Sequence, residues 1–311
     1  MSGVTTVSAS SERSSTARWR GTAMGARAEL ILNHPDQRQA ETALQLVLDE
    51  IRRLEKVFNL YDPESSLSLL NQQGVLHMPP PDLVRCMDDA GRISQLTDGA
   101  FDVTVQPLWN LYSQHFATYP TSTQGPGRSK LEAVTGFIDY RALEISLRSI
   151  RFAKSGMSAT LNGIAQGYIT DRAAELLKSR GFNNVLIDLG ETRGVGHRED
   201  GTHWRVGIKA PNGSGMLSRK ISLHDKAVAT SGSYGTRFST NGNHHHLFDP
   251  KTGRSANLWK SVSVIADDAT RADALSTAFS NLPESKIRNI AKTLDVSVIA
   301  INGDKTFSIN I

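Results

Sequence analysis

The order of the predicted helices and strands constrains the fold of this chain more than any other feature of its sequence. Apolar residues at spacings of three and four predict a long helix over residues 36–58 and a second helix over residues 82–96. Further helices are predicted over residues 164–180, 272–281 and 284–294. Strands are predicted over residues 24–32, 185–189, 204–209, 226–230, 261–266 and 296–301. Because strands and helices do not alternate strictly, we predict a mixed α+β fold rather than a doubly wound parallel sheet.

The start of the chain differs in composition from the rest. Residues 1–18 are rich in Ser and Thr and lack a charged start followed by an apolar stretch. We therefore expect a disordered leader or the remnant of an export segment over residues 1–18. No long linker interrupts residues 19–311, so we predict that they form a single domain.

Several function classes lose support from what the sequence lacks. The sequence contains no apolar run of about 18 residues, so we expect no membrane-spanning helix. The net charge is +4 and the basic residues are scattered, so we expect no nucleic-acid partner. The sequence has no P-loop, no G-x-S-x-G elbow, no H-E-x-x-H pair and no complete G-x-G-x-x-G.

Three segments carry residues suited to a binding site, and each has a structural alternative. Residues 97–102 hold two acids around a glycine, but their spacing also suits a turn that ends a helix. Small residues in L-N-G-I-A-Q-G-Y, at 161–168, would let a pyrophosphate approach a helix N-terminus, or would permit close helix packing. Hydroxyls at 230–233 suit phosphate or ribose at a strand end, or form a Ser/Gly turn.

Two further segments carry candidate catalytic side chains. In the run of three histidines at 244–246, His244 and His246 would share one face of a strand, and a turn follows at 249–253. A histidine of this kind is commonly a hydrogen-bonded structural residue. In a helix, Asp273 and Thr277 would lie one turn apart and offer two hard oxygens of the kind that Mg²⁺ prefers. Alternatively, Thr270 and Asp273 form a capping box.

Taken in order, these segments resemble the FAD:protein FMN transferase family, also called ApbE-like. The similarity extends from about residue 21 to about residue 300. The shared motifs are Met-Gly at 24–25, an aromatic and a Ser…Asn pattern over 61–71, T-D-G-x-F-D at 97–102, A-Q-G-Y at 165–168, Leu-Gly at 189–190, T-S-G at 230–232, H-x-x-D-P-x-T-G at 246–253 and A-D-A-x-x-T at 272–277.

This resemblance implies a fold and an activity. The implied fold is of the tunnelling-fold (T-fold) type, with antiparallel sheets packed against helices. The implied enzyme transfers FMN from FAD to a Ser or Thr hydroxyl of an acceptor flavoprotein and releases AMP, with Mg²⁺ bound. The acceptor would be a membrane-associated domain with a Ser/Thr flavinylation motif, and the location would be the periplasm.

The resemblance also assigns roles to individual residues. Asp273, Thr277 and the Ala165 carbonyl would hold Mg²⁺, and Asp273 would thereby be catalytic. His246 would be the general base, although it could instead contact the flavin or support the turn that follows. The residues implied to contact the flavin nucleotide are Met24, Tyr61, Asp98, Asp102, Ala165, Gln166, Thr230, Ser231, Gly232 and His246.

Two departures from the family pattern leave alternatives open. Gln166 stands where many members have Lys, and the chain reads Leu-Gly-Glu-Thr at 189–192 where many read Leu-Gly-Gly-Asp. Both forms resemble the NosX-like branch, which is associated with nitrous oxide reductase maturation. The alternatives are a non-catalytic FAD-binding protein, an FAD pyrophosphatase in which water replaces the acceptor, and an Mg²⁺-dependent enzyme acting on another nucleotide diphosphate.

Overall fold

A computed structural model describes residues 15–23, 25–34, 36–211, 217–303 and 305–310. Its main element is an eight-stranded sheet in which every neighbouring pair of strands is antiparallel. In spatial order the strands are β1 (Ser15–Ala23), β2 (Ala26–His34), β6 (Val185–Asp188), β7 (Thr192–Val195), β10 (Lys226–Gly232), β11 (Ser261–Ala266), β12 (Ser297–Asn302) and β13 (Lys305–Ile309). The predicted α+β fold with antiparallel sheets is confirmed.

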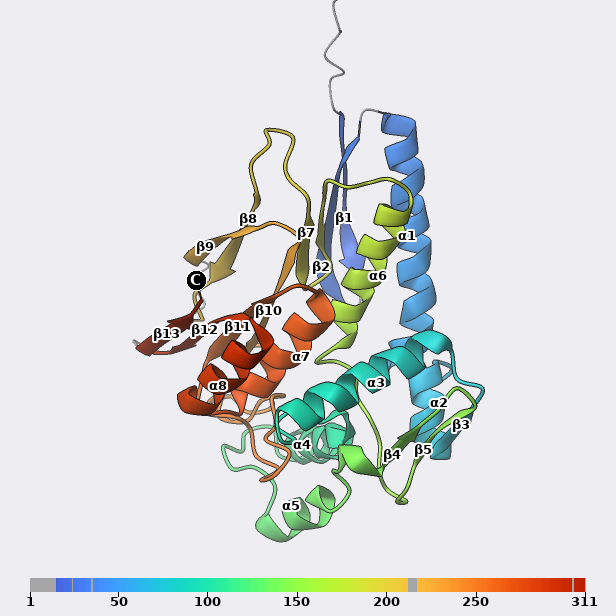
Figure 1. The fold of residues 1–311 in the computed structure, drawn as a ribbon. Coiled ribbons are helices and arrows are strands. Elements are labelled where there is room, and N and C mark those ends of the chain that lie inside the picture. The colour runs from blue at the N-terminus through green and yellow to red at the C-terminus, as the bar shows by residue number, and fades with distance from the viewer. Residues whose placement is uncertain (1–14, 24, 35, 212–216, 304, 311) are drawn as a thin grey trace, which may run out of the picture.

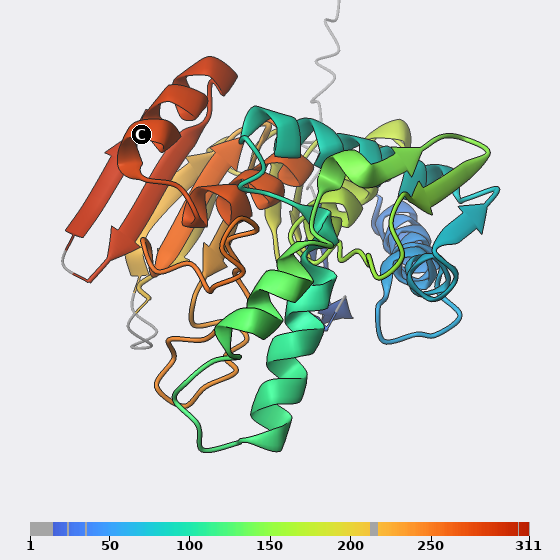
Figure 2. The ribbon, with the colours of Figure 1, turned by 90° about the horizontal axis from the view of Figure 1, so that it is seen from below.

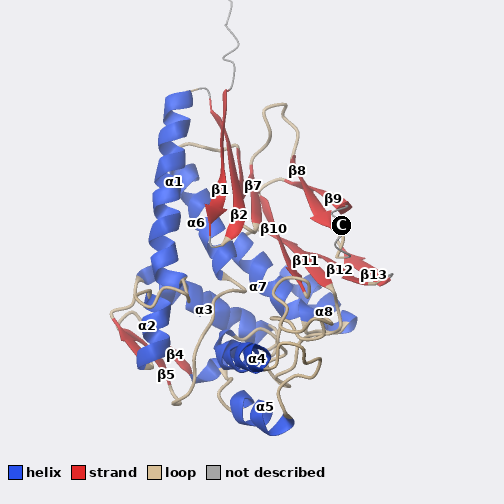
Figure 3. Cartoon of the chain, turned by 180° about the vertical axis from the view of Figure 1, so that it is seen from behind, coloured by secondary structure: helices blue, strands red, loops and turns tan. Residues whose placement is uncertain are grey.

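Helices cover one face of this sheet and a hairpin covers the other (Figures 1 and 3). The helices are α1 (Gln37–Phe58), α6 (Ala165–Ser179), α7 (Ala269–Ser280) and α8 (Glu284–Leu294). The hairpin consists of β8 (Trp204–Lys209) and β9 (Leu217–Leu223), and its apolar side chains form a second core with Val228 and Ile299 of the sheet. Because both faces are covered, the central strands are apolar on both sides.

A smaller region packs against one end of the sheet and its helices. In Figure 2 its helices α4 and α5 project away from the large sheet. It contains a three-stranded sheet in the order β3-β5-β4. Its elements are α2 (Ser66–Gln73), β3 (Val75–His77), α3 (Pro81–Leu96), the 3₁₀ turn η1 (Val103–Val105), α4 (Gln106–Thr118), α5 (Arg128–Thr135), the 3₁₀ turn η2 (Tyr140–Ala142), β4 (Leu143–Ile145) and β5 (Ser149–Phe152).

Two predicted boundaries are wrong by three residues or more. Strand β1 begins at Ser15, so residues 15–18 belong to the sheet and not to a leader; residues 1–14 lie outside the described residues. Helix α7 begins at Ala269, because Asp268 has an extended backbone and its side chain accepts a hydrogen bond from the Arg271 amide at 2.7 Å. Thr270 therefore lies inside the helix, and the alternative capping box with Asp273 does not form.

Among the described residues, none of the helices combines the length and the apolar character that a membrane crossing requires.

Candidate active site

The N-terminal turns of α6 and α7 meet in direct backbone contact. A Cβ atom added to Gly167 would lie 2.2 Å from the Ala269 carbonyl oxygen, so glycine is required for this approach. Each helix then presents a carboxylate to the other. The Gly167 amide donates to Asp273 Oδ2 at 3.0 Å, and the Ala269 amide donates to Asp171 Oδ1 at 2.9 Å. In both helices the carboxylate follows the contacting amide by four residues. We call Gly167, Asp171, Ala269 and Asp273 the α6–α7 clamp.

The Asp171 end of the clamp is closed by hydrogen bonds. Besides Ala269, its carboxylate accepts from the Thr270 amide at 2.8 Å and from Thr270 Oγ1 at 2.6 Å. Arg193 of β7 completes the set by donating Nη1 to Oδ1 of the same carboxylate. Asp171 is buried, and both of its oxygens are occupied.

The Asp273 end opens into a cavity. Among the described residues, the Gly167 amide is the one donor to the buried Asp273 carboxylate. Burial raises the pKa of Asp273 to about 7, with the negative charge of Asp171 adding to the rise and the Gly167 hydrogen bond opposing it. Thr277 lies one turn further along α7, and its Oγ1 is 3.1 Å from Ser231 Oγ at the end of β10.

The cavity has a volume of about 230 Å³ and an acidic, uncharged-polar and aromatic lining. Asp102, Glu191 and Asp273 contribute carboxylates, while the described lining residues include no Lys or Arg. Burial raises the pKa of Glu191 well above its ordinary value, and the nearby charge of Asp273 raises it further. An anionic ligand that entered this cavity would therefore need a cation beside it.

The T-D-G-A-F-D segment separates its two acids. Asp102 lines the cavity but directs its oxygens to its own surroundings: it accepts from the Thr104 amide at 2.8 Å, Thr104 Oγ1 at 2.6 Å and the Tyr140 amide at 2.9 Å. Asp98 does not line the cavity. It is exposed, has a positive φ, and pairs with Lys251 at 2.8 Å, which fits the turn alternative for this residue.

His246 lines the cavity together with Asp273. Its Nδ1 lies 3.2 Å from the Thr236 carbonyl oxygen, and because a carbonyl can only accept, Nδ1 carries the proton. Burial lowers the pKa of His246, which favours a neutral ring with an unprotonated Nε2. The neighbouring His245 is buried and bonds the Ala256 carbonyl through Nε2 at 2.8 Å, which is a structural role.

Four of the other predicted contacts line the same cavity. These are Gln166, Thr230, Ser231 and Gly232. Ala165 is the buried first residue of α6, within the turn that contacts Asp273 through Gly167. Met24 lies outside the described residues.

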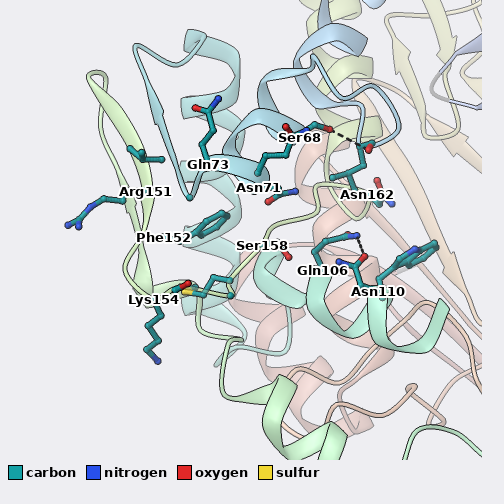
Figure 4. Close-up of a pocket in the computed structure, with 18 of the residues that line it drawn as sticks. Ser68, Asn71, Gln73, Gln106, Asn110, Arg151, Phe152, Lys154, Ser158 and Asn162 are labelled. Carbon is teal, nitrogen blue, oxygen red and sulfur yellow. Dashed lines mark hydrogen bonds between the residues drawn. The ribbon is translucent and has the colours of Figure 1, made fainter. Parts of the chain in front are cut away.

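Tyr61 lines a second, larger hollow of about 880 Å³, which we call the groove. Figure 4 shows the groove with Asn71 and Asn162 in its lining. The two hollows share Trp109 and Asn162 in their linings. Asn71, at the end of the predicted Ser…Asn pattern, holds the wall of this groove: its side chain donates to the Ala159 carbonyl at 2.8 Å and accepts from the Ala159 amide at 2.7 Å. Tyr61 therefore does not line the cavity that contains Asp273, but it lines the groove that adjoins this cavity.

Some lining residues were not predicted as site residues. Glu191, Trp109, Asn162 and Tyr234 all border the cavity. Glu191 had one signal in the sequence, a charged residue directly after a buried apolar strand. Asn162 lies within the L-N-G-I-A-Q-G-Y segment and Tyr234 directly follows the hydroxyls at 230–233, but neither was assigned a role, and Trp109 lies in a segment without a pattern.

A metal site at Asp273 would be built from mixed oxygen donors. Within the described part of the chain there is no group of three or more His, Cys, Asp or Glu side chains placed to hold an ion. One carboxylate, one hydroxyl and one backbone carbonyl, with water and a phosphate, would instead match the oxygen coordination of Mg²⁺.

Comparison with known proteins identifies close similarity over almost the whole chain. Residues 24–301 match the model of the ApbE family. The FAD:protein FMN transferase of Haemophilus influenzae is 30% identical over 252 residues, which cover 78% of this chain and 72% of that protein. The corresponding Escherichia coli protein is 28% identical, over 80% of this chain and 74% of its own.

Comparison with solved structures also finds similarity to ApbE proteins. The flavin transferase ApbE from Vibrio cholerae superposes with a TM-score of 0.82 at 25% identity, covering 96% of this chain and 98% of that one. The ApbE protein from Thermotoga maritima gives a TM-score of 0.84 at 26% identity, covering 95% and 97%.

Proposed function

The chain belongs to the ApbE family, and we propose that it transfers FMN from FAD to a Ser or Thr hydroxyl of a protein acceptor, with release of AMP. The acceptor oxygen forms a bond to the phosphorus of the FMN half, and the bond from that phosphorus to the AMP oxygen breaks. The AMP phosphate leaves with the electron pair of that bond.

The observation that carries this proposal is the acidic lining of the cavity, which can bind a cation but offers an anion no positive partner among the described residues. Its lining offers Asp273, Glu191 and Asp102 without a Lys or Arg among the described residues, whereas the diphosphate of FAD is an anion. Such a ligand suits this cavity only when a divalent cation is bound between them. Placement of both phosphates and neutralisation of their charge account for most of the catalysis of phosphoryl transfer.

We propose that the cation is Mg²⁺, held by the Asp273 carboxylate, Thr277 Oγ1 and the Ala165 carbonyl. The fit rests on Asp273, a buried carboxylate with a raised pKa and one protein donor among the described residues. A bound Mg²⁺ would supply Lewis-acid polarisation of the attacked phosphoryl group. Thr277 is held in place by Ser231, so its oxygen needs little reorganisation.

His246 is the proposed general base. Its Nε2 is the unprotonated nitrogen of a neutral ring whose Nδ1 proton is held by the Thr236 carbonyl. In this role it takes the proton of the acceptor hydroxyl as that oxygen attacks. Replacement by Ala is expected to slow transfer about 100-fold while sparing FAD binding; loss of FAD binding would make His246 a ligand contact instead.

The remainder of FAD requires more room than the cavity provides. The connected groove supplies this room, and Tyr61 offers an exposed aromatic face there for the isoalloxazine ring. Gln166 would contact the ligand without the positive charge of the lysine found in many relatives.

We further propose a periplasmic location, a membrane-associated acceptor domain and a role in nitrous oxide reductase maturation, on the resemblance to the NosX-like branch alone. Detection of the mature chain in the periplasmic fraction of its host would test the location. Loss of flavin from one protein in a deletion strain would identify the acceptor.

The decisive experiment combines the purified protein, FAD, Mg²⁺ and a candidate acceptor. We expect AMP release and an acceptor mass increased by one covalently attached FMN, both abolished by EDTA. Free FMN formed equally well without acceptor would indicate a pyrophosphatase, and FAD binding without AMP would indicate a non-catalytic binding protein. A preference for NAD or ADP-ribose in binding assays would indicate another nucleotide diphosphate.

A further inference from the structure

We infer that Asp171 is a positioning residue, which fixes the start of α7 against α6 and thereby sets the positions of Asp273 and Thr277. The inference rests on the proposed function where it takes the ligand of these two residues to be a divalent cation. Asp171 does not line the cavity. It lies on α6. Its negative charge raises the pKa of Asp273 through space, and its hydrogen bonds act on the site through α7.

The contacts of Asp171 are suited to holding a helix end. The first amides of a helix have no partners within the helix, and Asp171 accepts from two of them, those of Ala269 and Thr270. The Thr270 hydroxyl donates to the same carboxylate. This is the role of a capping residue, but it is provided by another helix 98 residues earlier in the chain.

Arg193 fixes Asp171 in turn. It belongs to β7, two residues after Glu191, so its bond to Asp171 ties the sheet edge of the cavity to both helices. Its Nε is buried without a hydrogen-bond partner in the described part of the chain, where the Asp171 carboxylate is the group to which this guanidinium donates.

The clamp geometry transmits this anchoring to the cavity. Backbone contact between Gly167 and Ala269 prevents α7 from moving closer to α6. Asp171 prevents the start of α7 from moving away. If that restraint is lost, the bond from the Gly167 amide to Asp273 Oδ2 is the next one to lengthen, because Asp273 lies one turn along the same helix.

Hydrogen exchange at the Gly167 amide tests this path directly. We expect Asp171→Asn to speed exchange of that amide about tenfold, although residue 171 makes no bond to it. Asp268→Ala is the matched control, because it removes the cap within α7 and leaves the tie between the helices intact. Unchanged Gly167 protection in Asp171→Asn, or equal loss in both variants, would overturn the inference.

Cation binding supplies the second readout, with Mn²⁺ alone as the probe and electron paramagnetic resonance as the measurement. We expect Asp171→Asn to weaken Mn²⁺ binding about 10- to 100-fold and Asp268→Ala to leave it unchanged. Arg193→Gln keeps Asp171 and is expected to give an intermediate loss that Arg193→Lys partly restores. A lower Tm of Asp171→Asn with wild-type Mn²⁺ affinity would reduce Asp171 to a purely structural residue and overturn the inference.

These results separate the two claims. If the wild-type protein releases no AMP from FAD, but Asp171→Asn exposes Gly167, the proposed function fails and the positioning role stands. If the wild-type protein releases AMP, and Asp171→Asn changes neither Gly167 exchange nor Mn²⁺ binding, the positioning role fails and the proposed function stands.

Discussion

Asp171 and Asp273 occupy equivalent places in α6 and α7, yet their surroundings are opposite. Each follows the contacting amide by four residues, and each accepts a hydrogen bond from the first turn of the other helix. Asp171 receives three further hydrogen bonds, which close its oxygens. Asp273 receives none of these among the described residues and borders the cavity.

This difference teaches that the type and helical position of a residue do not settle its role. A buried carboxylate with its hydrogen bonds complete stabilises the fold, because its charge is compensated within the protein. A buried carboxylate with few donors is costly to keep ionised unless a cation from outside completes it. The same motif thus serves as an anchor at one end and as a candidate ligand at the other.

The largest expected effect comes from Asp273→Asn. If Asp273 is a cation ligand and not a second anchor, AMP release from FAD falls about 1,000-fold, because stabilisation by the bound cation is lost. The free energy of unfolding of the metal-free variant should stay the same or rise, because a buried carboxylate is neutralised. Loss of stability without loss of AMP release would mean that the two ends of the clamp are alike.

The pH dependence of stability gives the next largest effect. The folded pKa of Asp273 is raised to about 7 from an ordinary value of 3.8, so the folded chain holds a proton that the unfolded chain releases. Stability of the metal-free protein therefore falls as pH rises from about 4 to about 7 and is level above that, by up to about 4 kcal/mol for this group.

Chemical denaturation of wild type and Asp273→Asn across this range measures the contribution of Asp273 as the difference between their slopes, since Glu191 and other buried acids remain in both. Parallel slopes would show that Asp273 titrates normally in the folded protein. Saturating Mg²⁺ should flatten the wild-type slope, because it competes with the proton.

Gly167→Ala tests the contact that both ends share. The added methyl would meet the Ala269 carbonyl oxygen, so α6 and α7 must separate. We expect a loss of about 1–3 kcal/mol in the free energy of unfolding. Weaker Mn²⁺ binding should accompany it, because Gly167 and Asp273 move apart. The variant Gly91→Ala, in helix α3 and with open space around it, provides a control for the same change in a helix away from the clamp.

The smallest effects come from a matched pair of threonines. Thr277→Val removes a hydroxyl at the cavity, and Thr270→Val removes one that donates to Asp171. We expect Thr277→Val to weaken Mn²⁺ binding about tenfold with little change in stability. Thr270→Val should lower the free energy of unfolding by about 1 kcal/mol, and its effect on Mn²⁺ should be the smaller of the two. If both variants changed Mn²⁺ binding and the free energy of unfolding equally, the Asp171 and Asp273 ends of the clamp would not differ in role.

Much of the fold follows from local patterns in the sequence. Strands β8 and β11 and helix α8 have their predicted bounds, and α1 begins one residue after its predicted start, because Asp36 is the N-cap. Helix α4 was not predicted, although Leu108, Tyr112 and Phe116 form its buried stripe at a spacing of four. Polar residues between them interrupt the apolar pattern, so packing against the loops around Phe248 decides its position.

The site follows from the sequence less completely. Motif order pointed to Asp273, Thr277 and His246, which the fold brings to one cavity. Glu191 and Arg193 could not be paired with α6 and α7 in advance, because the order β6-β7-β10 within the sheet sets those contacts. Nor could Asp98 and Asp102 be separated, because the local turn decides which of the two faces inward.

The bond between Gly167 and Asp273 joins residues 106 positions apart. A ligand that requires both helices can recognise only a chain whose second half has already docked on its first. Binding of the ligand would then stabilise the completely folded chain, since a ligand that binds only the native state shifts the folding equilibrium toward that state. Fragments that end before α7 would retain the residues that line the groove and yet remain unable to bind that ligand.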